Sequence, residues 1–153
     1  MPAVRMAPIV DQIRRAKRWV DGHIESHGGD PGKLTVSGHS AGAHLATMLF
    51  DDDSRPSGIK GALLLGGIYD LRPLQESFLA PEIAITDEEV ERFSPIDHRF
   101  DPSVTVQISR MSLASVNHMS SVRDLGVPDT DAARSLVHLL RLKSRRCAHW
   151  SIP

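Results

Sequence analysis

The feature that most constrains this chain is a serine bracketed by glycines between an apolar run and a helical pattern. Residues 38–42 read Gly-His-Ser-Ala-Gly. Residues 34–37 predict a short buried strand, and residues 43–50 predict a helix that leaves it at once. Ser40 must therefore lie on a very tight turn with a strained backbone. We expect this turn to press residues 38 and 42 together, so that only glycine fits comfortably at either position.

This turn predicts a chemistry as well as a shape. Hydrolases with a serine nucleophile present its hydroxyl above the sheet in this way, which points to ester or amide hydrolysis through an acyl-enzyme on Ser40. Gly38, His39 and Gly42 would complete the nucleophile elbow. The backbone N–H of Ala41, at the start of the helix, would supply half of an oxyanion hole. The alternative is a coincidental glycine turn, which the flanking strand and helix disfavour.

Length and composition limit the organisation and the partners. The chain has 153 residues, 41% of them hydrophobic, and a formal net charge of -1. One domain is expected, with a small-molecule ester or amide as partner rather than nucleic acid or a membrane. No stretch resembles a signal peptide or a membrane span, which favours a cytoplasmic protein. The single cysteine, Cys147, has no partner for a disulfide or a zinc site, and serine hydrolysis requires neither a metal nor an organic cofactor.

The N-terminal region predicts an amphipathic helix. Pro8 opens it, and Gly28 and Gly29 end it. Apolar residues recur every three or four positions along one face. The other face is expected to be solvated and carries a basic run, Arg14, Arg15, Lys17 and Arg18.

The later elements alternate as a parallel sheet requires. Residues 59–65 predict a second buried strand joined to the first by a right-handed crossover. Residues 70–100 carry scattered prolines and acids, which favours a loop or a small helical cap over the sheet edge. A last strand over 104–108 and a helix around 131–142 finish the pattern. The predicted class is α/β, with a mainly parallel sheet flanked by helices.

Three segments carry a family resemblance. Residues 30–46 resemble the nucleophile region of α/β-hydrolases, in the branch of kynurenine formamidases (arylformamidases) and hormone-sensitive-lipase-like esterases. Residues 66–74, Gly-Gly-Ile-Tyr-Asp-Leu-Arg-Pro-Leu, and residues 85–96 are similar to the formamidases in particular. The resemblance covers about residues 8–100. It implies a small aryl formamide or a short-chain ester as substrate.

The resemblance also implies an N-terminally truncated chain with a partial fold. Family members carry several strands and a His-Gly-Gly oxyanion loop before the nucleophile helix, and this chain starts too late to contain them. Residues 27–29 read His-Gly-Gly, but between the first helix and the strand a helix stop is the plainer interpretation. A sheet without the missing strands would have an exposed edge and an uncovered apolar face. That edge predicts homo-oligomerisation or aggregation.

The general base is predicted near the C-terminus. His149, followed by Trp-Ser-Ile, resembles the family's C-terminal histidine run. A frayed surface histidine is the alternative interpretation. His138 falls on an apolar helical pattern that favours a packed histidine, and His118 and His98 are weaker alternatives.

The acid of the triad is unknown. After strand 104–108 the family shows glycine and an acidic residue, whereas this chain reads Ser-Arg-Met-Ser. The next carboxylate is Asp124, which could serve only in a rearranged loop. Asp70 matches a family motif as a turn residue, where a side chain more often caps backbone N–H groups than orients a histidine.

Composition changes in the last third of the chain. Every glutamate lies at or before Glu91, and the family resemblance fades after about residue 100. We therefore divide the single domain, residues 1–153, into a family-like part, 1–100, and a divergent tail, 101–153. A shifted reading frame is one hypothesis for the tail. Two functions stay open: a serine hydrolase of small esters or aryl formamides, and an inactive hydrolase remnant or associating module.

Overall fold

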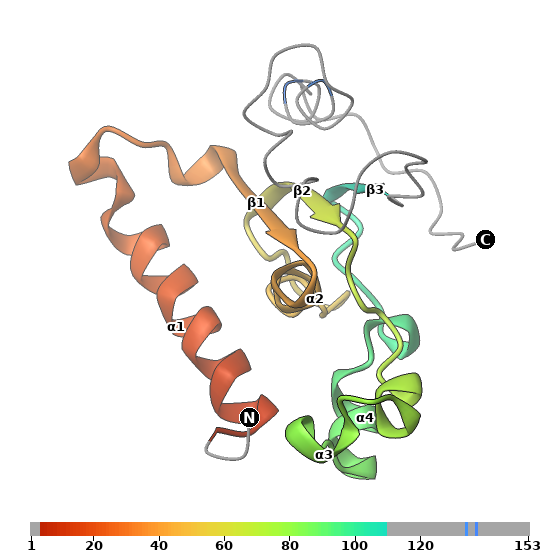
Figure 1. The fold of residues 1–153 in the computed structure, drawn as a ribbon. Coiled ribbons are helices and arrows are strands. Elements are labelled where there is room, and N and C mark those ends of the chain that lie inside the picture. Colours follow the sequence, from red (N-terminus) through yellow and green to blue (C-terminus); the bar gives the residue numbers. More distant parts are fainter. Residues whose placement is uncertain (1–3, 110–133, 135–136, 138–153) are drawn as a thin grey trace.

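A three-stranded parallel sheet lies at the centre of the molecule (Figure 1). The computed structural model describes residues 4–109, 134 and 137. Strand β1 spans Leu34–His39, β2 spans Ile59–Leu65 and β3 spans Thr105–Ser109, in the spatial order β1-β2-β3. The predicted parallel sheet is confirmed, and β1 runs two residues further than the expected 34–37.

The described part of the chain also forms four α-helices. Helix α1 spans Met6–His23, α2 Ala41–Thr47, α3 Ala80–Ile83 and α4 Asp87–Phe93. Figure 1 shows α1 on the β1 side of the sheet, with its N-terminal end near α3 and α4. Residues 70–100 therefore form short helices, as one of the two sequence-based alternatives predicted, and they include two short 3₁₀ helices, Arg72–Glu76 and Pro95–Asp97.

Strand β2 forms the centre of the core because its side chains are apolar on both faces. All of its residues are buried except Lys60, whereas every residue of β1 is exposed or only half-buried. Ala62 and Leu64 pack against Ala43 and Ala46 of α2 in the main apolar cluster. Burying a leucine side chain contributes about 1.5–3 kcal/mol, so this strand dominates the stability of the sheet.

Two glycines stop the first helix and its 3₁₀ extension, Ile24–His27. Gly28 adopts a left-handed conformation, with a φ of 81°, and its N–H bonds the Glu25 carbonyl. The Gly29 N–H reaches back to the Ile24 carbonyl at 2.9 Å. This pattern is that of a helix C-terminus, which confirms the helix-stop interpretation of residues 27–29.

A second apolar cluster joins α1, α2 and the helical segment of residues 70–97. Its buried members are Val10, Met48, Leu71, Val90 and Phe93. Polar bonds reinforce it at the start of α1, where Glu89 accepts hydrogen bonds from the Met6 N–H and the Arg5 guanidinium. Glu89 also closes a capping box with Thr86 at the start of α4. One carboxylate thus binds the N-terminal ends of two helices, where negative charge is favoured.

The sequence predicted that the whole basic run of α1 is solvated, and this is wrong for Arg14. Arg14 donates to the Met48 carbonyl at 3.0 Å and to both Asp51 oxygens at 2.7 and 2.9 Å. The Nη2 group reaches both carboxylate oxygens while the Nε group binds the carbonyl, and the helical periodicity alone does not reveal these partners. Lys17 instead pairs with Asp21 on α1 itself, and Arg15 with Asp11.

Two further sequence predictions concern a C-terminal helix and membrane-spanning segments. The helix expected over 131–142 lies outside the described residues except for positions 134 and 137, both of which are helical. Among the helices of the described residues, none combines the length and apolar character needed to cross a bilayer.

Candidate functional site

Ser40 occupies the tight turn that the sequence predicts. Its backbone has φ 55° and ψ -124°, a region that non-glycine residues rarely adopt. The Ser40 N–H donates to the Leu65 carbonyl at 2.9 Å, while its own carbonyl accepts from the N–H groups of Ala43 and His44 at 3.0 and 3.2 Å. The serine thus joins the sheet ladder to the first turn of α2. Such strain costs about 1–3 kcal/mol, and the bonds on both sides hold the residue in place.

The two glycines of the motif have different reasons to be there. A Cβ on Gly38 would lie 2.2 Å from the Gly42 carbonyl oxygen and 2.6 Å from the Ala43 nitrogen, which are backbone atoms. Glycine is therefore required at position 38, as predicted. A Cβ on Gly42 meets nothing within 4 Å among the described residues, so the expectation of crowding there is wrong. Gly38 lies against the backbone of the first turn of α2, whereas Gly42 is exposed on that turn.

The start of α2 leaves backbone donors beside Ser40. The first N–H groups bonded within the turn are those of Ala43 and His44, so the N–H groups of Ala41 and Gly42 precede the first helical bond. Both residues are exposed, and Ser40 is half-buried. This position agrees with the predicted role of the Ala41 N–H as an oxyanion donor, which stays a prediction. His39, also half-buried, ends β1 in register with Leu65.

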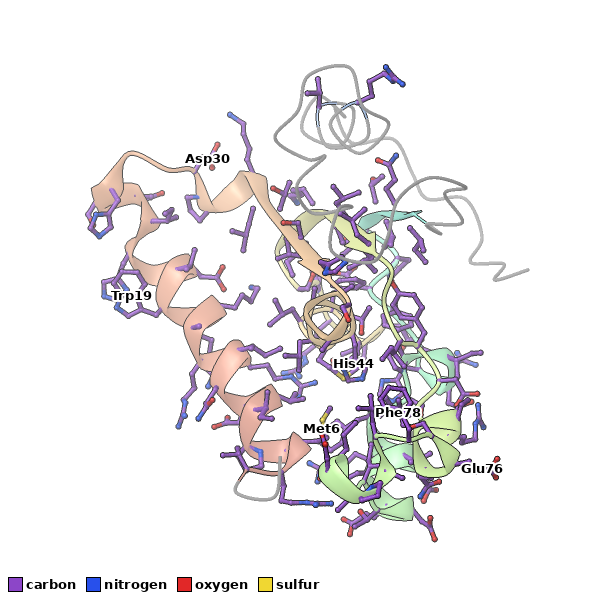
Figure 2. All side chains as sticks on the ribbon, viewed as in Figure 1. Met6, Trp19, Asp30, His44, Glu76 and Phe78 are labelled. Carbon is purple, nitrogen blue, oxygen red and sulfur yellow. The ribbon has the colours of Figure 1, made fainter. Side chains whose placement is uncertain are left out.

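No side chain within the described residues is hydrogen-bonded to the Ser40 hydroxyl. His23 and His27 lie beside Trp19 on the first helix and its extension, and Figure 2 shows Trp19 on the side of α1 away from the sheet. Two of the candidates for base and acid, His98 and Asp70, are among the described residues. The other candidates fall on residues that the structure does not describe. These are His118, Asp124, His138 and His149, and the same holds for Cys147.

His98 lies at the other end of α2 from the serine. Its Nδ1 is 3.6 Å from the Asp51 carboxylate, which also binds Arg14. Asp51 follows the C-terminal end of α2, and at about 1.5 Å per residue the helix places that end about 10 Å from its start. The structure therefore does not bring His98 to Ser40.

Asp70 acts as the turn residue that the sequence predicts. Its Oδ1 accepts from the Arg72 backbone N–H at 3.0 Å and from the Arg72 Nε at 2.7 Å. The bond from the Arg72 side chain, followed by that from its backbone, lowers the pKa of the carboxyl below its usual value. Both bonds bind the carboxylate to its own turn rather than to a histidine.

Close packing explains Gly67, at the carboxyl end of β2. A Cβ there would lie 2.5 Å from the Tyr69 ring and hydroxyl. Gly67 therefore makes room for the tyrosine. Burial raises the pKa of Tyr69 to about 12, so the phenol stays protonated.

Sequence reasoning missed His44, one helical turn after Ser40. Its side chain is buried, and its Nε2 lies 2.7 Å from the Phe93 carbonyl oxygen. Figure 2 places it below α2, on the side toward α4. Burial is the main cause of a lowered pKa, and the Phe93 bond opposes it only in part. A histidine on the buried face of the helix, at Ser40 plus four, was the available signal.

Metal ligands are not gathered anywhere in the described part of the chain. There, no three histidine, cysteine or acidic side chains lie close enough together to hold an ion.

Comparisons with known proteins agree with this geometry. Residues 7–71 match the carboxylesterase family. A kynurenine formamidase from Salmo salar is 39% identical over 98 residues, covering 61% of this chain and 32% of that protein. A probable carboxylic ester hydrolase from Mycobacterium tuberculosis, LipM, is 34% identical over 79 residues, covering 45% and 18%. The chain thus spans about a third or less of the length of these relatives.

Solved structures show the same fold. A putative thioesterase from Silicibacter superposes with a TM-score of 0.65 at 22% identity, covering 91% of this chain and 60% of that one. Esterase 2 from Thermogutta terrifontis, phosphoramylated by tabun, superposes with a TM-score of 0.52 at 25% identity, covering 79% and 47%. The sheet, the turn at Ser40 and these matches identify the chain as a relative of the α/β-hydrolases with a partial form of their fold.

Proposed function

We propose that this chain carries the nucleophile of a serine hydrolase that acts on small carboxylic esters or aryl formamides. The observation that carries the proposal is the backbone of Ser40, held at positive φ between β1 and α2. A strained serine at a strand-to-helix turn places its hydroxyl at the carboxyl edge of a parallel sheet, where such folds bind ligands. The names of the matched relatives, a formamidase and a carboxylic ester hydrolase, support this substrate class.

The proposed reaction is acyl transfer to Ser40 and then to water. The Ser40 oxygen attacks the substrate carbonyl carbon while its proton passes to a histidine, for which His149 is the candidate. The Ala41 N–H donates to the oxygen that becomes negative. The C–O or C–N bond then breaks, and the leaving group takes the proton from the histidine. Water then attacks the acyl carbon and gives its proton to the histidine, the bond to the Ser40 oxygen breaks, and the proton returns to that oxygen. The candidate to orient the histidine is Asp124.

Covalent labelling tests this proposal directly. The full chain is treated with a fluorophosphonate, an organophosphorus reagent of the broad kind that modified the Thermogutta esterase. We expect a single adduct on the peptide that contains Ser40, found by mass spectrometry, and none in Ser40→Ala. Ser37→Ala, at an exposed serine of β1, is the matched control and should be labelled like the wild type. Folded protein that stays unlabelled would contradict the proposal.

The second candidate is an inactive hydrolase remnant that associates with another copy through its sheet edge. The specific observation is β1, which lies at the edge of the described sheet and has no buried residue. Unpaired N–H and C=O groups on such an edge can pair with another chain. Size-exclusion chromatography coupled to light scattering separates the cases. A concentration-dependent dimer without labelling supports the remnant, and a labelled monomer supports the enzyme.

A further inference from the structure

His44 links the helix that follows Ser40 to the helical segment of residues 70–97. Its backbone N–H donates to the Ser40 carbonyl at 3.2 Å, so the residue belongs to the turn itself. Its side chain, only 4% exposed, extends to the Phe93 carbonyl oxygen at 2.7 Å. One residue therefore contacts both the serine turn and the end of α4.

The hydrogen-bond partner determines the form of the imidazole. A carbonyl oxygen only accepts, so Nε2 must carry the proton, whichever charge state the ring has. Burial, opposed only in part by this bond, keeps the ring neutral near pH 7 because it lowers the pKa. Electrostatic repulsion from His98 lowers the pKa of His44 in the same direction. The resting form is the neutral tautomer with hydrogen on Nε2.

The acceptor has a specific need for this donor. Phe93 is the last residue of α4, where carbonyl groups lack an intrahelical partner. The chain around it is buried: Phe93 is 5% exposed and Ser94 is fully buried, with its Oγ accepting from the Leu71 N–H at 3.1 Å. Without the imidazole, the Phe93 carbonyl would lose this donor in a buried setting, which is unfavourable.

We propose that His44 is a positioning residue for Ser40, acting through its Nε2–H bond to the Phe93 carbonyl. The bond prevents α2 from sliding or rotating relative to residues 70–97, and the Ser40 backbone moves with α2 because the His44 N–H bonds its carbonyl. The reactivity of Ser40 then depends on the bond between His44 and the Phe93 carbonyl, which lies on the side of α2 that faces α4. The catalytic consequence rests on the proposed function, whereas the mechanical link does not.

Three variants separate positioning from general stability. His44→Phe keeps a ring but removes the donor, and His44→Gln keeps an N–H at a similar reach. Thr47→Val is the matched control, because Thr47 is fully buried on the same helix and its hydroxyl donates to the His44 carbonyl at 2.6 Å. Denaturant titration gives the folded fraction of each variant, and the rates below are compared per folded molecule.

The first measurement is the rate of Ser40 modification by a fluorophosphonate. We expect His44→Phe to slow this modification at least about tenfold more than Thr47→Val does, a difference of about 1.4 kcal/mol in the barrier. His44→Gln should recover most of the lost rate. Equal rates in His44→Phe and Thr47→Val, or no recovery in His44→Gln, would overturn the positioning role.

The second measurement does not depend on catalysis. Amide hydrogen exchange is followed at Ala43, bonded to the Ser40 carbonyl, and at Ser94, bonded to the Val90 carbonyl. Both amides should exchange faster in His44→Phe than in Thr47→Val, and nitrogen-15 NMR of the wild type should show hydrogen on Nε2. If the wild type is never labelled but these signals are found, the proposed function fails and the link stands. Unchanged exchange at both amides refutes the link.

Discussion

The β1–α2–β2 unit and the outer layer of α1 with residues 70–97 are stabilised in different ways. In the unit, Leu63 and Leu64 are fully buried and the turn at Ser40 is held by backbone bonds. In the outer layer, ion pairs between distant residues, above all Arg5 with Glu89 and Arg14 with Asp51, supplement the apolar cluster of Val10, Met48, Leu71, Val90 and Phe93.

This difference teaches where each region is vulnerable. Backbone geometry and apolar packing do not titrate, but they tolerate no added atom where the backbones touch. Ion pairs and capping bonds tolerate changes in shape, but they depend on protonation and salt. The candidate nucleophile lies in the first kind of region, and the segment that packs beside its helix lies in the second.

The largest effect is expected at Gly38. Gly38→Ala places a Cβ 2.2 Å from a backbone oxygen, so β1 and α2 must separate. We expect a loss of about 3 kcal/mol or more in the free energy of unfolding, measured by urea titration. Gly42→Ala is the matched change and should cost less than about 1 kcal/mol, because alanine favours a helix. Equal losses at both positions would erase the asymmetry between the two glycines.

The next effect breaks the outer layer at its most connected carboxylate. Glu89→Gln removes the charge that binds Arg5 and the Met6 N–H, and we expect a loss of about 1–3 kcal/mol. Amide exchange should rise first in the initial turns of α1 and α4 and not in β2. Glu88→Gln, exposed on the same helix, should stay within about 0.5 kcal/mol. Faster exchange in β2 would show that the two regions unfold together.

Acid should weaken the contacts of residues 70–97 in two separate pH windows, one through His44 and one through Glu89. The pKa of His44 is lowered from its usual 6.5, so the unfolded chain binds more protons and stability falls as the pH drops below about 6.5. Glu89 has a pKa below its usual 4.5, because bonds from Met6, Thr86 and Arg5 outweigh its burial. Its contribution is present above about pH 4.5 and is lost as the pH falls through the lowered value.

Unfolding free energies at several pH values test both windows. His44→Gln should flatten the upper window and leave the lower one, and Glu89→Gln should do the reverse. A wild type whose stability is constant between pH 7.5 and 5.5 would contradict the upper window.

The smallest effect is expected at Arg15. Its pair with Asp11, at 3.3 Å, has both side chains more than half exposed, and such pairs contribute about 0–1 kcal/mol. Arg15→Ala should shift the unfolding free energy by less than about 0.5 kcal/mol. Arg14→Ala, one position earlier, should cost about 1 kcal/mol or more through the bonds to Asp51 and Met48. Equal losses would mean that the basic run is a solvated face after all.

Much of the fold was predictable because its signals are local. The run of residues 59–65 is apolar on both faces, and β2 has those same bounds. Gly28 ends the first helix and its extension in a left-handed conformation, as the conformational freedom of glycine implies. The strain at Ser40 followed from a strand and a helix with almost no residues between them.

Other features were not predictable, because they depend on partners distant in sequence. Arg14 and Arg15 look alike along the chain, and only the position of Asp51 distinguishes them. Glu89 lies 84 residues from Arg5, and no periodicity announces that pair. The predicted roles of His149 and Asp124 stay predictions, since both lie outside the described residues.

The sequence by itself determined the serine turn, the parallel class of the sheet and the relationship to the α/β-hydrolases, since these follow from local residue patterns and from the alternation of strands and helices. Only the tertiary structure decided which glycine is crowded, which arginine is anchored and that His44 joins α2 to Phe93. The physical reason is that backbone conformation is set by neighbours along the chain. Contacts between side chains and distant carbonyls or carboxylates exist only once the elements have packed.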